Sequence, residues 1–243
     1  MPRHEQLNNK KHKSLRLDTK KRARYGDNVT GCLVFPGEFK DVAKELPIYF
    51  QKNGDANEYQ AITLFGFEEQ ENLFLSDDDW QGRYVPALIR REPFLIGFNK
   101  ASESNEPEIH IDMESPRITD GASGEPVFLE SGNTAPVVDE VRAALTLVHS
   151  GMQQTKAMFE AYESLDLIEP FLLDITFDNG SQYKTDKYYT LNQDKLYSLD
   201  HKTVIELHKS GLLQMAYLIL SSLSNVKYLI DKKNTLLNVG KSN

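Results

Sequence analysis

The chain has 243 residues, 40% hydrophobic and 26% charged, which is the composition of an ordinary globular protein rather than a disordered or fibrous one. Its longest apolar run, Leu212 to Leu223, falls short of the roughly twenty residues that span a bilayer, and a lone cysteine, Cys32, excludes an intramolecular disulfide. The net charge of −8 combines +7 over residues 1–25 (nine Lys/Arg, two Asp/Glu) with −15 over the remainder (19 Lys/Arg, 34 Asp/Glu).

The basic segment contains two clusters, Lys10-Lys11-His12-Lys13 and Lys20-Lys21-Arg22-Ala23-Arg24, of a kind that occurs in nucleic-acid-binding patches. The acidic remainder would repel a phosphate backbone, so we expect no nucleic-acid partner. We expect residues 1–25 to form a flexible arm across the acidic body, with Leu15 and Leu17 adding an edge strand. A single domain over 26–235 and a tail over 236–243 would follow. The polar N-terminus has no apolar signal segment, which favours a cytoplasmic protein.

The first half of the chain predicts mainly strands, separated by turn residues. Asn53-Gly54 is a strong hairpin signal between two of them, and the strand over 59–67 is apolar on both faces, which is typical of a central strand. The segment 125–129 is expected to return to the sheet. The predicted strands cover 29–35, 48–51, 59–67, 94–99 and 108–113.

The second half predicts helices and one further hairpin, over 172–177 and 182–191. An apolar stripe favours a helix from Pro136 almost to Leu165, with Gly151 as a possible bend. Asp200 is placed to cap a helix that Gly211 closes. The segment Leu212 to Ile230 is apolar almost all round, which predicts a buried helix. Together these elements predict an α+β fold, with an antiparallel or mixed sheet from the N-terminal half covered by helices largely from the C-terminal half.

The stretch from Trp80 to Phe94 holds the only tryptophan, three arginines and two prolines, and predicts a short helix over 86–92. One interpretation places its apolar side chains in the core and its arginines in salt bridges. The other brings two arginines together on an anionic group beside the aromatic rings, because arginine forms forked bonds to carboxylate or phosphate. The candidate ligand-binding residues are Trp80, Arg83, Tyr84, Arg90, Arg91, Asp112 and Glu125.

His110 and Asp112 have the spacing of two ligands of a two-histidine, one-carboxylate iron site, and a strand would place them on one face. The third ligand would have to be His149, His201 or His208. No pattern in the sequence indicates which, so we predict no metal and no cofactor.

Several phrases read together resemble the bacterial SapC family, over about Leu15 to Leu229. The phrases are Glu38-Phe39, Leu46-Pro47-Ile48, Glu71-Asn72-Leu73-Phe74, Trp80 with Gly82-Arg83-Tyr84-Val85-Pro86-Ala87, Ile89-Arg90-Arg91 with Pro93-Phe94, Ile111-Asp112, Gly124-Glu125-Pro126, Leu207-His208 with Ser210-Gly211-Leu212, and Leu220-Ser221-Ser222-Leu223 before Asn225. The chain departs from the pattern at Glu92, where an aromatic residue is expected, and at Phe128-Leu129-Glu130, where Phe-Asp is expected.

The resemblance implies an accessory role, because SapC-like proteins are often encoded near flavin-dependent halogenases, cupin-like oxygenases and outer-membrane receptors. We therefore predict a non-catalytic binding or accessory protein that holds a small molecule, a peptide or a partner enzyme at the Trp80–Phe94 stretch. One alternative is a metal-dependent, oxygenase-like enzyme using His110 and Asp112. The other, which the family name implies, is a surface-layer-associated structural protein.

Overall fold

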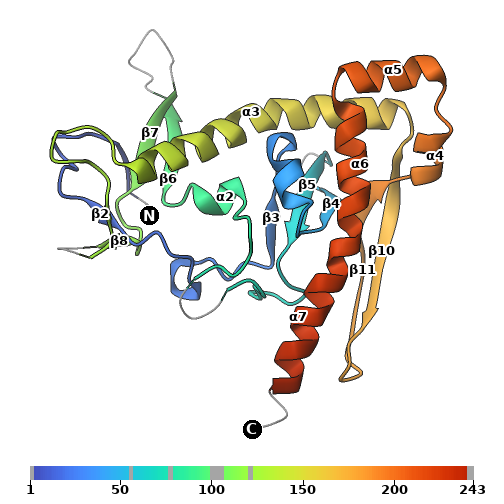
Figure 1. Ribbon diagram of the computed structural model, residues 1–243, viewed down its shortest axis with the longest axis horizontal. Coiled ribbons are helices and arrows are strands. Elements are labelled where there is room, and N and C mark those ends of the chain that lie inside the picture. Colours follow the sequence, from blue (N-terminus) through green and yellow to red (C-terminus); the bar gives the residue numbers. More distant parts are fainter. Residues whose placement is uncertain (1–2, 55–56, 76–78, 99–106, 120–122, 240–243) are drawn as a thin grey trace. The chain divides into compact units, whose positions relative to one another are not determined.

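The computed structural model describes residues 3–54, 57–75, 79–98, 107–119 and 123–239 (Figure 1). Its residues form two compact units. The first unit contains Met1–Asn28, Leu75–Gln81 and Ala87–His149, and the second contains Val29–Phe74, Gly82–Pro86 and Ser150–Asn243. The acidic residues Asp77 and Asp78 before Trp80, most of the loop 101–107 and part of the loop 120–124 lie outside the described residues.

The first unit contains two small antiparallel sheets. In one, β7 lies between β1 and β6, and in the other β2 lies between β8 and β9. The strands are β1 (His4–Gln6), β2 (Arg16–Leu17), β6 (Phe94–Phe98), β7 (Pro107–Asp112), β8 (Ile118–Thr119) and β9 (Glu125–Pro126).

Apolar residues of both sheets form one core with the first part of helix α3 (Pro136–Ser164), the part that belongs to this unit. Leu17 of β2, Phe94 of β6 and Ile111 of β7 are buried there, beside Val138 and Val141 of the helix. The clean alternation of β7 is what presents Ile111 to this core and leaves His110 and Asp112 on the opposite face.

The sequence predicted an edge strand near Leu15 and Leu17. The structure has a central strand there, because β2 pairs with β8 on one side and with β9 on the other. Strand β1 also pairs with β7. The division into an arm (1–25), a single domain (26–235) and a tail (236–243) stays a prediction.

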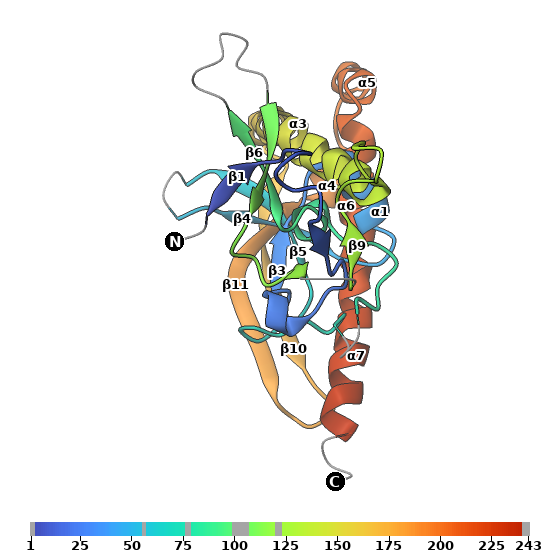
Figure 2. The ribbon, with the colours of Figure 1, turned by 90° about the vertical axis from the view of Figure 1, so that its left-hand side faces the viewer.

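The second unit contains a five-stranded antiparallel sheet in the order β10-β11-β4-β5-β3. Strand β5 has neighbours on both sides, as its two apolar faces predict, and Asn53 and Gly54 lie in the β4–β5 hairpin. The predicted C-terminal hairpin is present and longer than expected (Figure 2). The strands are β3 (Gly31–Leu33), β4 (Ile48–Lys52), β5 (Tyr59–Leu64), β10 (Ile168–Thr176) and β11 (Gln182–Leu191).

The helices lie mostly in the C-terminal half, and the α+β prediction is confirmed. None of the helices in the described part of the chain has both the length and the apolarity needed to cross a membrane. Besides α3, the helices and 3-10 turns are η1 (Ala23–Tyr25), η2 (Pro36–Glu38), α1 (Phe39–Val42), α2 (Ala87–Arg90), α4 (Gln193–Tyr197), α5 (His201–Lys209), α6 (Leu212–Ser222), η3 (Leu223–Asn225) and α7 (Val226–Val239).

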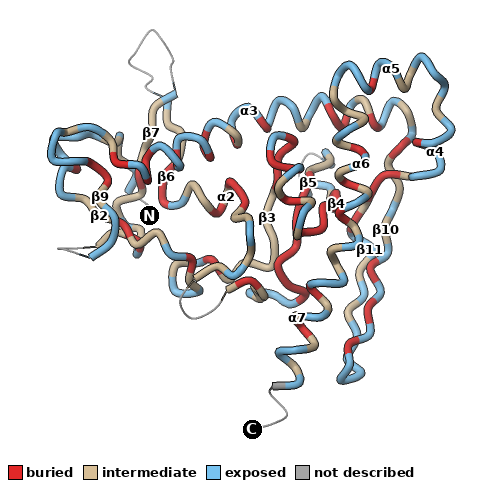
Figure 3. Tube along the Cα trace, viewed as in Figure 1, coloured by how far each residue is buried: buried red, intermediate tan, exposed pale blue. Residues whose placement is uncertain are grey.

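The core of the second unit lies where α1 and α6 pack against the sheet. Buried residues concentrate in β4 and β5, and exposed residues dominate α5 and the outer end of α7 (Figure 3). Two hydrogen bonds cross this packing: the backbone N–H of Ile48 donates to Ser222 Oγ (2.9 Å), and Asn225 Nδ2 donates to the carbonyl of Ala43 (2.9 Å). Such side-chain bonds satisfy backbone groups that the sheet and helix ends leave unpaired.

The segment Leu212 to Ile230 differs from its prediction. It forms α6, η3 and the start of α7, and the residues of α6 that are buried are Ala216, Ile219 and Ser222. Tyr217 and Tyr228 are 45% and 42% exposed. The expectation of a helix buried all round is therefore wrong, because the sheet covers only one side of these helices.

Local signals along the helices are confirmed more closely. Asp200 caps α5, accepting bonds from the N–H groups of Lys202 and Thr203, and Gly211 has φ +79 after the helix ends. Helix α3 continues through Gly151, where a Cβ atom would lie 2.5 Å from Phe35 Cβ. The glycine thus permits a close approach between α3 and Phe35.

Candidate functional site

The predicted site residues are divided between the two units, because the chain passes from the first unit to the second at Gly82 and returns at Ala87. Arg83 and Tyr84 belong to the second unit. The other predicted residues belong to the first unit: Trp80, Arg90 and Arg91 from the same stretch, Asp112 at the end of β7 and Glu125 in β9.

The arginines of the stretch differ in their surroundings. Arg91 is engaged within the protein, because its Nη1 donates to the carbonyl of Phe94 (2.7 Å) and its Nη2 lies 3.0 Å from Glu92 Oε1. Arg90, the last residue of the short helix α2, is half-buried. Arg83 is exposed, and among the described residues its guanidinium has no hydrogen-bond or ion-pair partner; only its backbone N–H is held, by Glu45 Oε2 (2.6 Å).

The two aromatic residues are both anchored. The backbone N–H of Trp80 donates to Asp79 Oδ1 (2.8 Å), and the same oxygen accepts the N–H of Lys21 (2.8 Å). In the second unit, Tyr84 donates its hydroxyl to Glu38 Oε2 (2.8 Å). Glu38 is only 1% exposed. A hydrogen bond to a buried carboxylate is among the stronger ones, so it fixes the ring of Tyr84.

The two acidic residues of the predicted site bind neighbouring protein groups. Asp112 Oδ1 accepts the backbone N–H of Arg3 (3.2 Å) and of Glu114 (3.0 Å), which holds the end of β7 against the residue before β1. Glu125 Oε1 accepts the hydroxyl of Thr19 (2.8 Å). These contacts give both carboxylates a structural role in the first unit.

The two residues of the metal hypothesis have other neighbours in this geometry. His110 and Asp112 do lie on one face of β7, but the ring of His110 packs over Gly97, where a Cβ atom would lie 2.3 Å from Nε2. Glu108 Oε2 is 3.8 Å from the same nitrogen. Within the described ranges, no group of three or more His, Cys, Asp or Glu side chains is arranged to hold a metal ion.

A buried ion network in the first unit was missed from the sequence. Arg117, 2% exposed, pairs through Nη2 with Asp27 Oδ1, donates through Nη1 to the carbonyl of Lys20 (2.8 Å), and lies over the ring of Tyr25 (5.0 Å to the centroid). Asp27, 3% exposed, also accepts the N–H of Arg22 (2.7 Å). The network therefore joins the basic N-terminal segment, through Lys20, Arg22 and Tyr25, to Arg117 of the same unit, and only the unusual density of charge before Asp27 could have indicated it.

Lys21 lies in the same network, 8% exposed, with its Nζ donating to the carbonyl of Thr19 (3.2 Å). Burial lowers the pKa of its ammonium group, and the nearby guanidinium of Arg117 lowers it further. The carboxylates of Asp27, Asp79 and Glu92 oppose this shift. Lys21 thus connects the network to residues at both ends of the Trp80–Phe94 stretch.

Cys32 is not activated for nucleophilic chemistry. Burial raises the pKa of its thiol well above the ordinary value, and the charge of Glu38 raises it further. Because the thiolate is the reactive form, a raised pKa disfavours nucleophilic chemistry at this thiol.

The fold and these contacts define an α+β protein of two small units, with an aromatic- and arginine-rich stretch that contributes residues to each of them. The family model of SapC matches residues 7–229, nearly the whole chain, and the chain belongs to the SapC family. Neither the curated proteins nor the solved structures contain a match to this chain.

Proposed function

We propose that this SapC-family chain is a non-catalytic binding or accessory protein of the cytoplasm. It holds an anionic group of a small molecule, a peptide or a partner enzyme on the Trp80–Phe94 stretch. The SapC resemblance of the sequence makes a flavin-dependent halogenase or a cupin-like oxygenase the partner enzyme to test first.

The observation that carries the proposal is the state of Arg83. Its guanidinium is exposed and, within the described part of the chain, unpaired, whereas that of Arg91 is bonded to Phe94 and Glu92. An arginine presents five donors in a fixed fork that matches a carboxylate or phosphate. The segment that carries Arg83 is held by Glu45 and, through Tyr84, by Glu38. The guanidinium of Arg83 is therefore positioned to bind such a group.

The test is native mass spectrometry of the protein isolated from its own host, as wild type and as Arg83→Gln. We expect a bound mass on the wild type that Arg83→Gln loses while its thermal midpoint stays unchanged. Arg83→Lys should recover little, because an ammonium cannot make the forked contact. Arg142→Gln is the matched control, since Arg142 is an exposed arginine whose partner is Asp139 on α3.

Three results would contradict the proposal. Retention of the full bound mass by Arg83→Gln would show that the ligand does not use this residue. Loss of the bound mass together with a lowered thermal midpoint would show that Arg83 acts on folding. Turnover of the bound compound by the isolated protein would favour an enzyme instead.

A further inference from the structure

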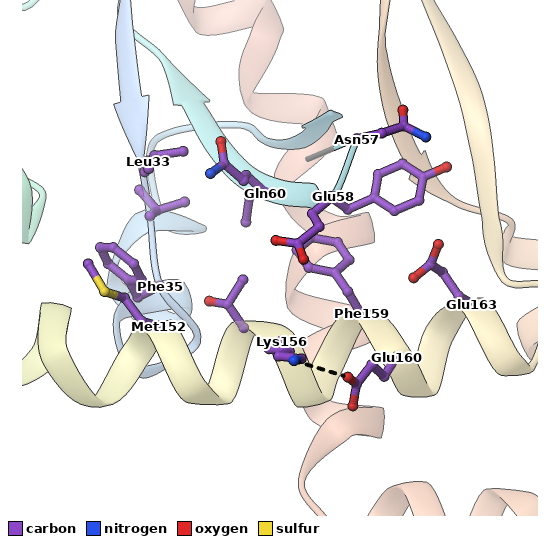
Figure 4. Close-up of a pocket in the computed structure, with 14 residues that line it drawn as sticks. Leu33, Phe35, Asn57, Glu58, Gln60, Met152, Lys156, Phe159, Glu160 and Glu163 are labelled. Atoms are coloured by element: carbon purple, nitrogen blue, oxygen red, sulfur yellow. Dashed lines mark ion pairs between the residues drawn. The ribbon is translucent and has the colours of Figure 1, made fainter. Parts of the chain in front are cut away.

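The second unit contains a cavity of about 650 Å³ between the last part of α3 and the segment around β3 and β5 (Figure 4). Its volume falls within the range of small-molecule sites. Phe35 and Met152 lie at one end, and Asn57 and Glu163 lie at the other.

One wall of the cavity is aromatic and rigidly packed. The ring of Phe159 on α3 stacks on that of Tyr59 (centroids 5.7 Å apart) and meets Phe50 edge-on (4.8 Å). Tyr59 in turn meets Tyr189 edge-on (5.1 Å). Phe159 is 4% exposed, so this wall is a fixed part of the core rather than a mobile surface group. Aromatic rings attract cations through the negative charge of their faces.

Two of these rings, Tyr59 and Tyr189, already hold a cation of the protein. Lys52 Nζ lies 5.0 Å from the centroid of Tyr59 and 5.8 Å from that of Tyr189. This contact lies within the distance at which an ammonium group and an aromatic face attract each other. Lys52 shows that rings of this cluster attract an ammonium group, and the ammonium of a ligand would have to bind beside the carboxylates rather than on the ring face that Lys52 occupies.

The charges around the cavity are mainly negative. Three carboxylates and one ammonium line it, for a formal sum of −2 (−3 and +1), and the ammonium of Lys156 lies 3.9 Å from Glu160. Within the described residues, the carboxylates of Glu58 and Glu163 have no ion-pair partner. The charge of Glu163 contributes, after burial and Tyr189, to a raised pKa of Tyr59, which places that carboxylate within electrostatic range of the aromatic wall.

One polar atom of the lining is also unsatisfied. Thr155 Oγ1 is removed from solvent and, among the described residues, has no hydrogen-bond partner. A buried hydroxyl without a partner is uncommon, because the lost hydrogen bonds to water are not replaced. An N–H or O–H group of a bound ligand would restore one of them.

We propose that this cavity binds an organic cation, a protonated amine on an aromatic or apolar body, with the ring against Phe159 and Tyr59 and the ammonium between Glu58 and Glu163. The site is separate from the anion contact at Arg83, carries the opposite charge preference and does not rest on it.

The experiment titrates the isotope-labelled full chain with phenethylamine and tryptamine, and with the neutral isosteres phenethyl alcohol and tryptophol. We expect saturable amide shifts at Thr155 and Phe159 with the amines and weaker binding of the alcohols. Glu58→Gln and Glu163→Gln should each weaken amine binding by roughly twofold to fivefold, and Lys156→Gln should strengthen it by a similar factor. Glu206→Gln, an exposed glutamate on α5, is the matched control and should change nothing.

Equal affinity for amines and alcohols would overturn the charge assignment, and tighter binding of phenylacetate than of either would reverse it. The absence of saturable shifts at cavity amides up to the solubility limit of the amines would remove the site. Arg83→Gln should bind the amines like wild type. A failed amine titration would therefore not contradict the anion contact at Arg83, and a failed test of Arg83 would not contradict the cation site in the cavity.

Discussion

The buried ions of the first unit and the carboxylates at the cavity of the second lie in opposite surroundings. Asp27 and Arg117 are 3% and 2% exposed and are paired with each other, whereas Glu58 and Glu163 are exposed and have no ionic partner within the described residues. A charge taken out of water must be compensated inside the protein. A charge left at a cavity rim costs little and stays available to a ligand. Charges of the first kind hold the fold, and charges of the second kind remain available for binding.

The largest loss of stability is expected when a buried, paired charge is removed. Arg117→Gln removes the guanidinium that neutralises Asp27, and loss of one partner of a buried ion pair costs about 3–5 kcal/mol. Urea denaturation measures the free energy of unfolding of the variant and of wild type. Lys184→Gln is the control, because Lys184 pairs with Asp174 at 64% and 46% side-chain exposure and should contribute only about 0–1 kcal/mol. Similar small losses in both variants would mean that burial does not distinguish the two pairs.

A smaller effect is expected at the packing beside the cavity. Gly151→Ala places a Cβ 2.5 Å from Phe35 Cβ, and forcing an extra methyl group into a filled space costs about 1–3 kcal/mol. The better helix propensity of alanine returns up to about 1 kcal/mol, so the net change should be destabilising. Gln154→Ala, at an exposed position of the same helix, should be neutral or stabilising. A stabilised Gly151→Ala protein would show that α3 and Phe35 can separate freely.

Local chemistry explains which elements could be predicted. The cap at Asp200, the turn at Gly211 and the β4–β5 hairpin depend on hydrogen bonds between residues a few positions apart, and each was found from the sequence. The pair Arg117–Asp27 joins residues 90 positions apart, and no local pattern encodes that choice of partner. The predicted site differs: the density of arginines was visible, and the partners of Arg91, Phe94 and Glu92, are close in sequence, but the conformation that turns Arg91 toward them and leaves the guanidinium of Arg83 exposed is not encoded by spacing alone.

The lowered pKa of the buried Lys21 predicts that the stability of the first unit depends on pH. The pKa of Lys21 is lowered in the folded state, chiefly by burial and then by Arg117, so between the lowered pKa and the ordinary value the unfolded chain binds more protons. Relative to Lys21→Met, wild type should therefore gain stability as the pH rises through that window and show no relative change below it. Denaturant unfolding of both proteins at about pH 7 and about pH 10 measures the difference, since other lysines cancel. A relative loss of wild-type stability at the higher pH would contradict the lowered pKa.

The smallest effect is expected at the cavity rim. Glu163→Gln should change the free energy of unfolding by less than about 0.5 kcal/mol, because an exposed side chain without an ionic partner contributes little. Burial, Tyr189 and then the charge of Glu163 raise the pKa of Tyr59, so removal of that charge should lower this pKa toward its ordinary value. A ring-carbon resonance of Tyr59, followed through an alkaline titration of wild type and variant, measures the shift, and Glu206→Gln should leave it unchanged. An unaltered pKa in Glu163→Gln would place the carboxylate out of range of the aromatic wall. The ammonium of a ligand could then not contact both, and the cation site would lose one of its two carboxylates.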